Sequence, residues 1–158
     1  MTRFLALAVL LAATPAVAKS PRDQMFPTDS SCYLRQYTLS HLASHPAQRV
    51  RQIALGPWAP EAGHQRYVAL RVAVGLRGTA ERFQGVAYCE NEADHLFCQM
   101  EGDAGSFVLE PRPNGAVRMT LTRAGIGFEG NQDFVEISGT SGDDRVFLLP
   151  PVAAGACP

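Results

Sequence analysis

The stretch that decides the fold is YVALRVAVGLR, residues 67–77. One face of this stretch is apolar at every second position, and the other face mixes small residues with tyrosine and arginine. The apolar face consists of Val68, Leu70, Val72, Val74 and Leu76. Such strict alternation is typical of an antiparallel strand with one buried face. We therefore expect a half-buried strand over residues 67–77.

Similar short alternating segments follow along the chain. Residues 81–89 and 95–101 each place apolar side chains at every second position, and residues 91–94 between them have the composition of a hairpin turn. Gly and Pro punctuate nearly every later junction between apolar runs. The pattern predicts an all-β fold, a small antiparallel meander barrel or sandwich of about eight strands. One short helical turn is expected near residues 40–48, opening at Ser40.

The chain contains four cysteines, and none of them forms a C-x-x-C motif. That spacing disfavours a redox motif or a zinc finger. Cys89 and Cys98 lie on the adjacent strands of the predicted hairpin, where a cross-strand disulfide is geometrically reasonable. This pairing leaves Cys32 and Cys157, whose bond would tie together the two ends of the folded region.

The first 18 residues, MTRFLALAVLLAATPAVA, read as a secretory signal peptide. Residues 19–30 are polar and contain two prolines, so we expect a flexible leader there, followed by a single disulfide-bonded domain over residues 31–158. Cleavage near Ala18 would place the protein in the periplasm or outside the cell.

The mature chain has no apolar stretch long enough to span a membrane. A formal net charge of −1 argues against a nucleic-acid binder, and we expect a monomer.

No catalytic motif is present. The sequence lacks a G-x-S-x-G elbow, and the phosphate-binding glycine motifs are incomplete. His41 and His45 have the spacing of helical zinc ligands, but Pro46 disfavours helical geometry at His45. The adjacent Asp143 and Asp144 would face opposite ways on a strand. We expect no enzyme activity, no metal and no cofactor; a metal-binding or hydrolytic protein using these dispersed residues is the second alternative.

The leading hypothesis is a binding module that engages a protein or an envelope component through its rim and loops. Trp58 is a candidate recognition anchor because it lies in a Gly-Pro-rich loop outside any periodic apolar face; the other interpretation is that it caps an open end of the core. The further candidate binding residues are Arg35, His41 and Arg145. The first alternative is a carrier that encloses a small apolar ligand in a hollow barrel.

The opening of the domain, CYLRQY at 32–37 followed by HLASHPAQRV at 41–50, resembles that of an uncharacterised group of small exported proteins of Gram-negative bacteria. The mid-chain cysteine pair, the GDDR stretch at 142–145 and the cysteine near the end fit the same resemblance. It implies a type of domain and transfers no catalytic or binding residue.

Overall fold

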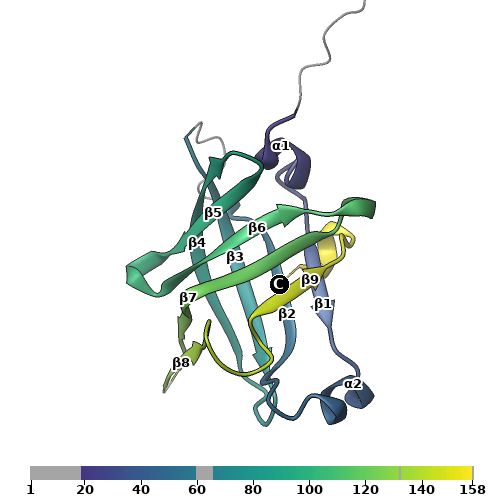
Figure 1. Cartoon of the computed structure of the whole chain (residues 1–158), viewed down its shortest axis with the longest axis vertical. Coiled ribbons are helices and arrows are strands. Elements are labelled where there is room, and N and C mark those ends of the chain that lie inside the picture. The colour runs from purple at the N-terminus through teal and green to yellow at the C-terminus, as the bar shows by residue number, and fades with distance from the viewer. Residues whose placement is uncertain (1–18, 60–65, 132, 158) are drawn as a thin grey trace, which may run out of the picture.

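The computed structural model describes residues 19–59, 66–131 and 133–157. The signal peptide expected over residues 1–18, with cleavage near Ala18, lies outside these ranges. The described strands form one antiparallel sheet (Figure 1). They are β1 (Tyr33–Gln36), β2 (Val50–Pro57), β3 (Val68–Leu76), β4 (Arg82–Glu92), β5 (His95–Met100), β6 (Gly105–Pro111), β7 (Val117–Glu129), β8 (Phe134–Ile137) and β9 (Val146–Leu149).

The sheet is a meander in which β1 to β8 pair in sequence order. The long strand β7 pairs with β8 through its second half and with β9 through its first half. The segment after β9 then reaches β1: the N–H of Leu34 donates to the carbonyl oxygen of Pro150 at 3.2 Å, and the N–H of Val152 donates to that of Cys32 at 2.9 Å. The sheet therefore curls until its first strand lies beside the segment that follows its last. This single barrel-like sheet confirms the predicted all-β meander and removes the sandwich as the architecture.

The alternation in residues 67–77 produces the predicted strand with one face in the core. β3 spans Val68–Leu76, and its five apolar residues face the core with exposures of 7% or less. The opposite face is less exposed than expected, because Ala69 and Ala73 are also buried. Arg71, between these two alanines, is partly exposed. The outer face of β3 therefore carries small side chains on both sides of Arg71.

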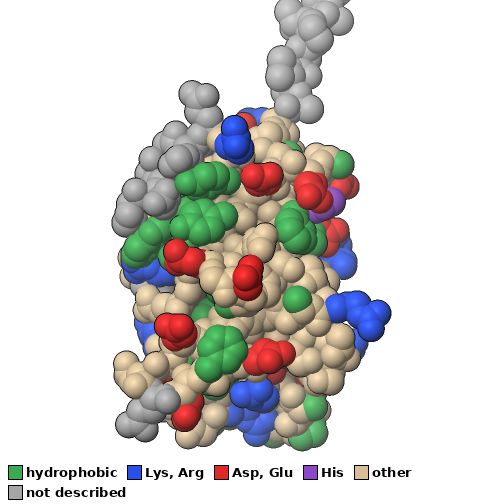
Figure 2. Space-filling view, turned by 90° about the vertical axis from the view of Figure 1, so that its left-hand side faces the viewer, with side chains coloured by type: hydrophobic (Ala, Val, Ile, Leu, Met, Phe, Trp, Pro, Cys, Tyr) green, Lys and Arg blue, Asp and Glu red, His purple; other side chains and the backbone are tan. Residues whose placement is uncertain are grey.

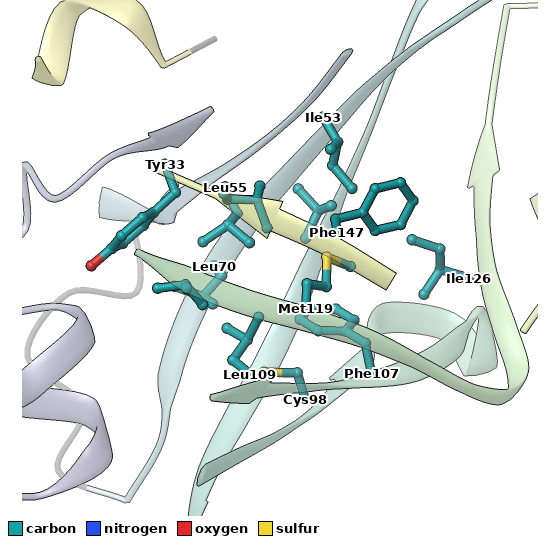
Figure 3. Packing of buried hydrophobic residues seen from close by; sticks show 14 of the residues in the cluster. Tyr33, Ile53, Leu55, Leu70, Cys98, Phe107, Leu109, Met119, Ile126 and Phe147 are labelled. Atoms are coloured by element: carbon teal, nitrogen blue, oxygen red, sulfur yellow. The ribbon is translucent and has the colours of Figure 1, made fainter. Parts of the chain in front are cut away.

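Side chains fill the interior of the curled sheet (Figure 3). Large residues from opposite strands meet there, each with less than 2% of its surface exposed. They include Phe107, Phe128, Phe147, Met119, Ile53, Leu55, Leu70 and Leu109. Close packing of this kind is typical of a domain core.

The N-terminal segment departs from the predicted flexible leader over residues 19–30. Helix α1 (Pro21–Met25) begins after Ser20, whose hydroxyl accepts a hydrogen bond from the N–H of Asp23. Met25 and the following Phe26 are buried in the core cluster, and the hydroxyl of Tyr33 donates to the carbonyl oxygen of Met25. The prediction was wrong because two isolated apolar residues in a polar segment give no periodic signal.

Helix α2 (Leu39–Ser44) confirms the helical turn expected near residues 40–48, although it is shorter. It begins after Thr38, whose hydroxyl accepts from the N–H of His41 at 3.2 Å. It ends at Ser44 because the residue before a proline, here His45, disfavours helical geometry. The helix lies at the end of the sheet where β2 begins (Figure 1).

Both expected disulfides are present. Cys89 and Cys98 are directly opposite each other in the β4–β5 pair and are bonded. The Cys32–Cys157 bond joins residues 125 positions apart and holds the C-terminal segment beside β1. Among the described residues, no helix is long and apolar enough to cross a membrane.

Candidate functional site

Trp58 lies on the outside of the curled sheet. It follows β2 directly, and its N–H donates to the carbonyl oxygen of Ala69 at 2.8 Å, which extends the pairing of β2 with β3. The guanidinium carbon of Arg71 lies 4.1 Å from the centroid of the indole ring. The ring is partly exposed and does not belong to the buried core cluster. Its surroundings thus fit the recognition-anchor interpretation better than the core-cap interpretation.

Trp58 borders a small pocket of about 240 Å³. Four segments build it: residues 29–32, the end of β2 with Trp58, Arg71 of β3, and the C-terminal residues around Cys157. The Cys32–Cys157 disulfide is part of the wall. A covalent bond between two of the segments makes this rim of the molecule a preorganised surface.

Three further aromatic residues share the outer surface with Trp58. Register explains their direction, since Cys89 and Cys98 point inward and their neighbours Tyr88 and Phe97 therefore point outward. Tyr67, just before β3, meets Tyr88 edge to face with ring centroids 5.3 Å apart. We call Trp58, Tyr67, Tyr88 and Phe97 the aromatic band. All four are partly exposed.

Sequence reasoning singled out Trp58 but missed Tyr88 and Phe97. The sequence does indicate that both side chains point outward, because each residue adjoins a cysteine on the inner face of the predicted hairpin. Residues next to inward-facing positions in a strand face outward. An aromatic residue at such a position is a candidate contact residue.

Carboxylates are concentrated on the same side of the molecule. Residues 83–111, which include most of β4 and all of β5 and β6, contain six Asp or Glu and no Lys or Arg. Figure 2 shows acidic and hydrophobic side chains interspersed on this side, with most of the visible Lys and Arg towards its edges. The chain as a whole is nearly neutral, with 14 basic and 15 acidic residues. Arginines lie beside this region, since Arg71 of β3 pairs with Val86 of β4 and Arg118 of β7 pairs with Glu110 of β6. The excess of carboxylates is therefore local to residues 83–111.

Three of these carboxylates line an open groove with two rings of the aromatic band. The groove has a volume of about 460 Å³, and Tyr88, Phe97, Glu90, Glu101 and Asp103 contribute to its lining. We call it the acidic groove. Glu101 and Asp103 come from the turn between β5 and β6, whose middle residue Gly102 has a positive φ of 66°.

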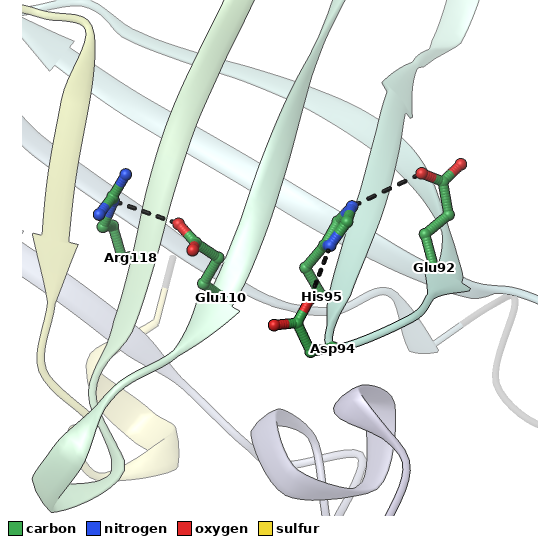
Figure 4. A network of polar contacts seen from close by, with 5 residues as sticks. All are labelled: Glu92, Asp94, His95, Glu110 and Arg118. Carbon is green, nitrogen blue, oxygen red and sulfur yellow. Dashed lines mark hydrogen bonds and ion pairs between the residues drawn. The ribbon is translucent and has the colours of Figure 1, made fainter.

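The other three carboxylates of this region have partners within the protein (Figure 4). His95 lies between Glu92 and Asp94, at N–O distances of 3.5 and 3.2 Å. The hydrogen bond from His95 lowers the pKa of Asp94. Glu110 pairs with Arg118 at 3.2 Å. By contrast, the carboxylates of the acidic groove form no ion pair with any residue in the described ranges.

Arg35 and His41, two further candidate binding residues, lie apart from the aromatic band. They belong to a stack of side chains at the α2 end, in which Arg35 lies over Tyr37 at 5.1 Å, Tyr37 stacks on His41 at 4.7 Å, and His41 stacks on His45 at 4.1 Å. Nε2 of His41 also lies 2.9 Å from Oε1 of Gln48. Tyr37 packs against the core cluster. These contacts indicate that the stack attaches α2 to the sheet.

Arg145 lies near this stack and away from Trp58. It is exposed and lines a groove of about 490 Å³ with His45, Asp143 and Thr120. The length of β2 separates this end from Trp58, because the N–H of Val50, the first residue of β2, donates to Asp144 while Trp58 follows the last residue. The structure thus groups Arg35, His41 and Arg145 at one end and leaves Trp58 at the other.

Asp143 and Asp144 do not form a joint site. Asp143 is exposed, whereas Asp144 is 3% exposed and accepts hydrogen bonds from the backbone N–H groups of Arg49 and Val50 at 2.5 and 3.1 Å. Burial raises the pKa of Asp144, and the two backbone hydrogen bonds act in the opposite direction. The buried carboxylate joins the loop before β9 to the start of β2.

Within the described residues, no group of three or more His, Cys, Asp or Glu is arranged to hold a metal ion. Comparison with known proteins finds no matching family model, no matching curated protein and no matching solved structure. The geometry of the chain itself is therefore the basis for a functional assignment.

Proposed function

We propose that this chain is an exported, non-catalytic binding module that engages a protein or an envelope component through the outer surface of its curled sheet. The observation that carries the proposal is the aromatic band, four partly exposed rings on one outer surface, with Trp58 stacked on Arg71. Aromatic residues and arginine are the side chains that most often anchor protein interfaces.

The filled interior supports this proposal over carriage of a small ligand. A carrier needs space inside the sheet, whereas Phe107, Phe128 and Phe147 all belong to the core cluster, with exposures of 2% or less. α1 adds Met25 and Phe26 to the same core. Recognition at the outer surface requires no rearrangement of this packing.

The two disulfides support export. Disulfides persist in oxidising compartments and are rare in the cytosol of most organisms. Both bonds also stabilise the proposed surface: one joins β4 to β5 beneath Tyr88 and Phe97, and the other lines the pocket beside Trp58. A preorganised surface loses less conformational entropy on binding.

The test is capture of a partner from an envelope extract of the producing organism by immobilised protein, with quantitative mass spectrometry. Phe97→Ala removes one ring of the aromatic band. Leu39→Ala is the control, because Leu39 is 87% exposed and begins α2, at the end of the sheet opposite Trp58. We expect a specific component whose recovery falls at least about ten-fold with Phe97→Ala and is unchanged with Leu39→Ala. Equal recovery by both variants would contradict the proposal.

A further inference from the structure

We infer that the partner presents an extended polypeptide segment rich in arginine or lysine, and that its cationic side chains enter the acidic groove. This inference rests on the proposed function and specifies the chemistry of the partner. It follows from the charge of the groove, from its aromatic rings and from carboxylates that form no ion pair with any of the described residues.

The local excess of carboxylates is the first argument. A nearly neutral protein places six carboxylates and no Lys or Arg in the 29 consecutive residues 83–111. Such a surface attracts cationic partners and repels anionic ones. The lining of the acidic groove contains three of these carboxylates and no Lys or Arg. The groove is therefore complementary to a basic polypeptide and unsuited to an anionic lipid or polysaccharide.

The rings supply the second argument. Tyr88 and Phe97 line the same groove as the carboxylates. A guanidinium or ammonium group is attracted to the face of an aromatic ring within about 6 Å of the centroid. The protein already contains one such contact on this surface, between Arg71 and Trp58. The combination of ring and carboxylate suits an arginine side chain, which stacks and forms bidentate hydrogen bonds.

The distribution of internal ion pairs supplies the third argument. His95 lies beside Glu92 and Asp94, and Arg118 pairs with Glu110, so each of these carboxylates has a partner within the protein. Glu90, Glu101 and Asp103 form no ion pair with any residue that the structure describes. These three carboxylates are the ones that line the acidic groove, where a bound cation would lie close to them.

A labelled peptide of about eight residues that alternates arginine with alanine tests the inference, because alternate residues of an extended segment face the same side. The same peptide with glutamate in place of arginine is the control ligand. Binding to the full mature protein is measured by fluorescence anisotropy at about 50 mM and about 300 mM NaCl. We expect a Kd on the order of 50 μM at the lower salt and weaker binding at the higher salt.

Two triple variants carry the same change in net charge. The groove variant combines Glu90→Gln, Glu101→Gln and Asp103→Asn, and the control variant combines Asp23→Asn, Asp133→Asn and Glu136→Gln at exposed positions elsewhere. The groove variant should weaken binding at least about ten-fold, and Phe97→Ala should weaken it about two- to five-fold. The control variant should change it much less.

Equal weakening by the two triple variants, equal binding of the glutamate peptide, or no binding at all would overturn the inference. The proposed function is tested separately, because loss of the captured envelope component in Phe97→Ala does not require that component to be basic. Peptide binding that fails while this capture effect persists would overturn the basic-partner inference and leave the binding surface in place.

Discussion

The guanidinium carbon of Arg71 lies 4.1 Å from the centroid of the Trp58 ring. Arg71 of β3 pairs with Gly56 of β2, and Trp58 follows two residues later, directly after β2. A Cβ at position 56 would lie 2.8 Å from the carbonyl oxygen of Ser31 and 3.4 Å from Sγ of Cys157, so glycine here lets the disulfide-linked segments approach this part of β2. The contact between Arg71 and Trp58 fixes the orientation of the aromatic residue that the sequence alone already identified as a candidate anchor.

Trp58 is the only tryptophan of the chain, so its fluorescence reports on this contact directly. We expect Arg71→Gln to increase quenching of the fluorescence by acrylamide, because the cation no longer covers one face of the ring. The lost cation–π interaction is worth about 0.5–1 kcal/mol at an exposed site. Unchanged quenching in a variant that remains folded by circular dichroism would contradict the proposed role of Arg71.

The stack at α2 predicts a change in stability rather than in binding. His41→Ala removes the ring between Tyr37 and His45 and the hydrogen bond to Gln48. We expect a loss of about 1–2 kcal/mol in the free energy of unfolding, with capture of the envelope component unchanged. Ser40→Ala, at an exposed position of the same helix, is the control. Loss of capture without loss of stability would instead make His41 a contact residue.

Asp144 predicts a pH dependence with a definite sign. Burial raises its pKa above the ordinary value of 3.8, so the folded state binds this proton more tightly than the unfolded state. Its contribution to stability is therefore largest below the unfolded pKa and is lost as the pH rises through the raised folded pKa.

Urea unfolding of the wild type and of Asp144→Asn between about pH 3 and pH 7 measures this effect, because the other carboxylates cancel in the difference. We expect the wild type to lose stability relative to the variant as the pH rises through the window above 3.8, and the difference to become constant at higher pH. The opposite slope would mean that the hydrogen bonds from Arg49 and Val50 outweigh burial.

The two disulfides are expected to differ in their contribution to stability. The Cys32–Cys157 bond closes a loop of 125 residues, and the Cys89–Cys98 bond closes one of nine. In the chain-entropy model these loops correspond to about 5 and about 2.6 kcal/mol. Replacement of each pair by alanine, followed by urea unfolding, measures the two values. A larger loss for the Cys89–Cys98 pair would contradict the prediction.

Local periodicity explains which parts of the fold the sequence predicts. Alternation identifies β3, and the position of Cys89 and Cys98 in a hairpin identifies their bond. Asp144 is different, because its hydrogen-bond donor Arg49 lies 95 residues away and no local pattern links them. Met25 and Phe26 are similar, since two adjacent apolar residues in a polar segment do not reveal that they complete the core.

The candidate site was predictable only in part for the same reason. Trp58 stands out by its composition and context, and Tyr88 and Phe97 follow from the direction of their cysteine neighbours. The meeting of Glu90 with the turn that carries Glu101 and Asp103 depends on how β4, β5 and the following turn fold against one another. Sequence spacing alone does not establish that proximity.

The most direct test of the binding surface is site-specific photo-crosslinking in the producing cell. A photoreactive phenylalanine analogue, p-benzoylphenylalanine, is introduced at position 97 in the aromatic band or, as the control, at position 39 in α2, where Leu39 is 87% exposed. We predict a discrete crosslinked adduct from position 97 and none from position 39. The same adduct from both positions, or no adduct from position 97, would contradict the assignment of the aromatic band as the binding surface.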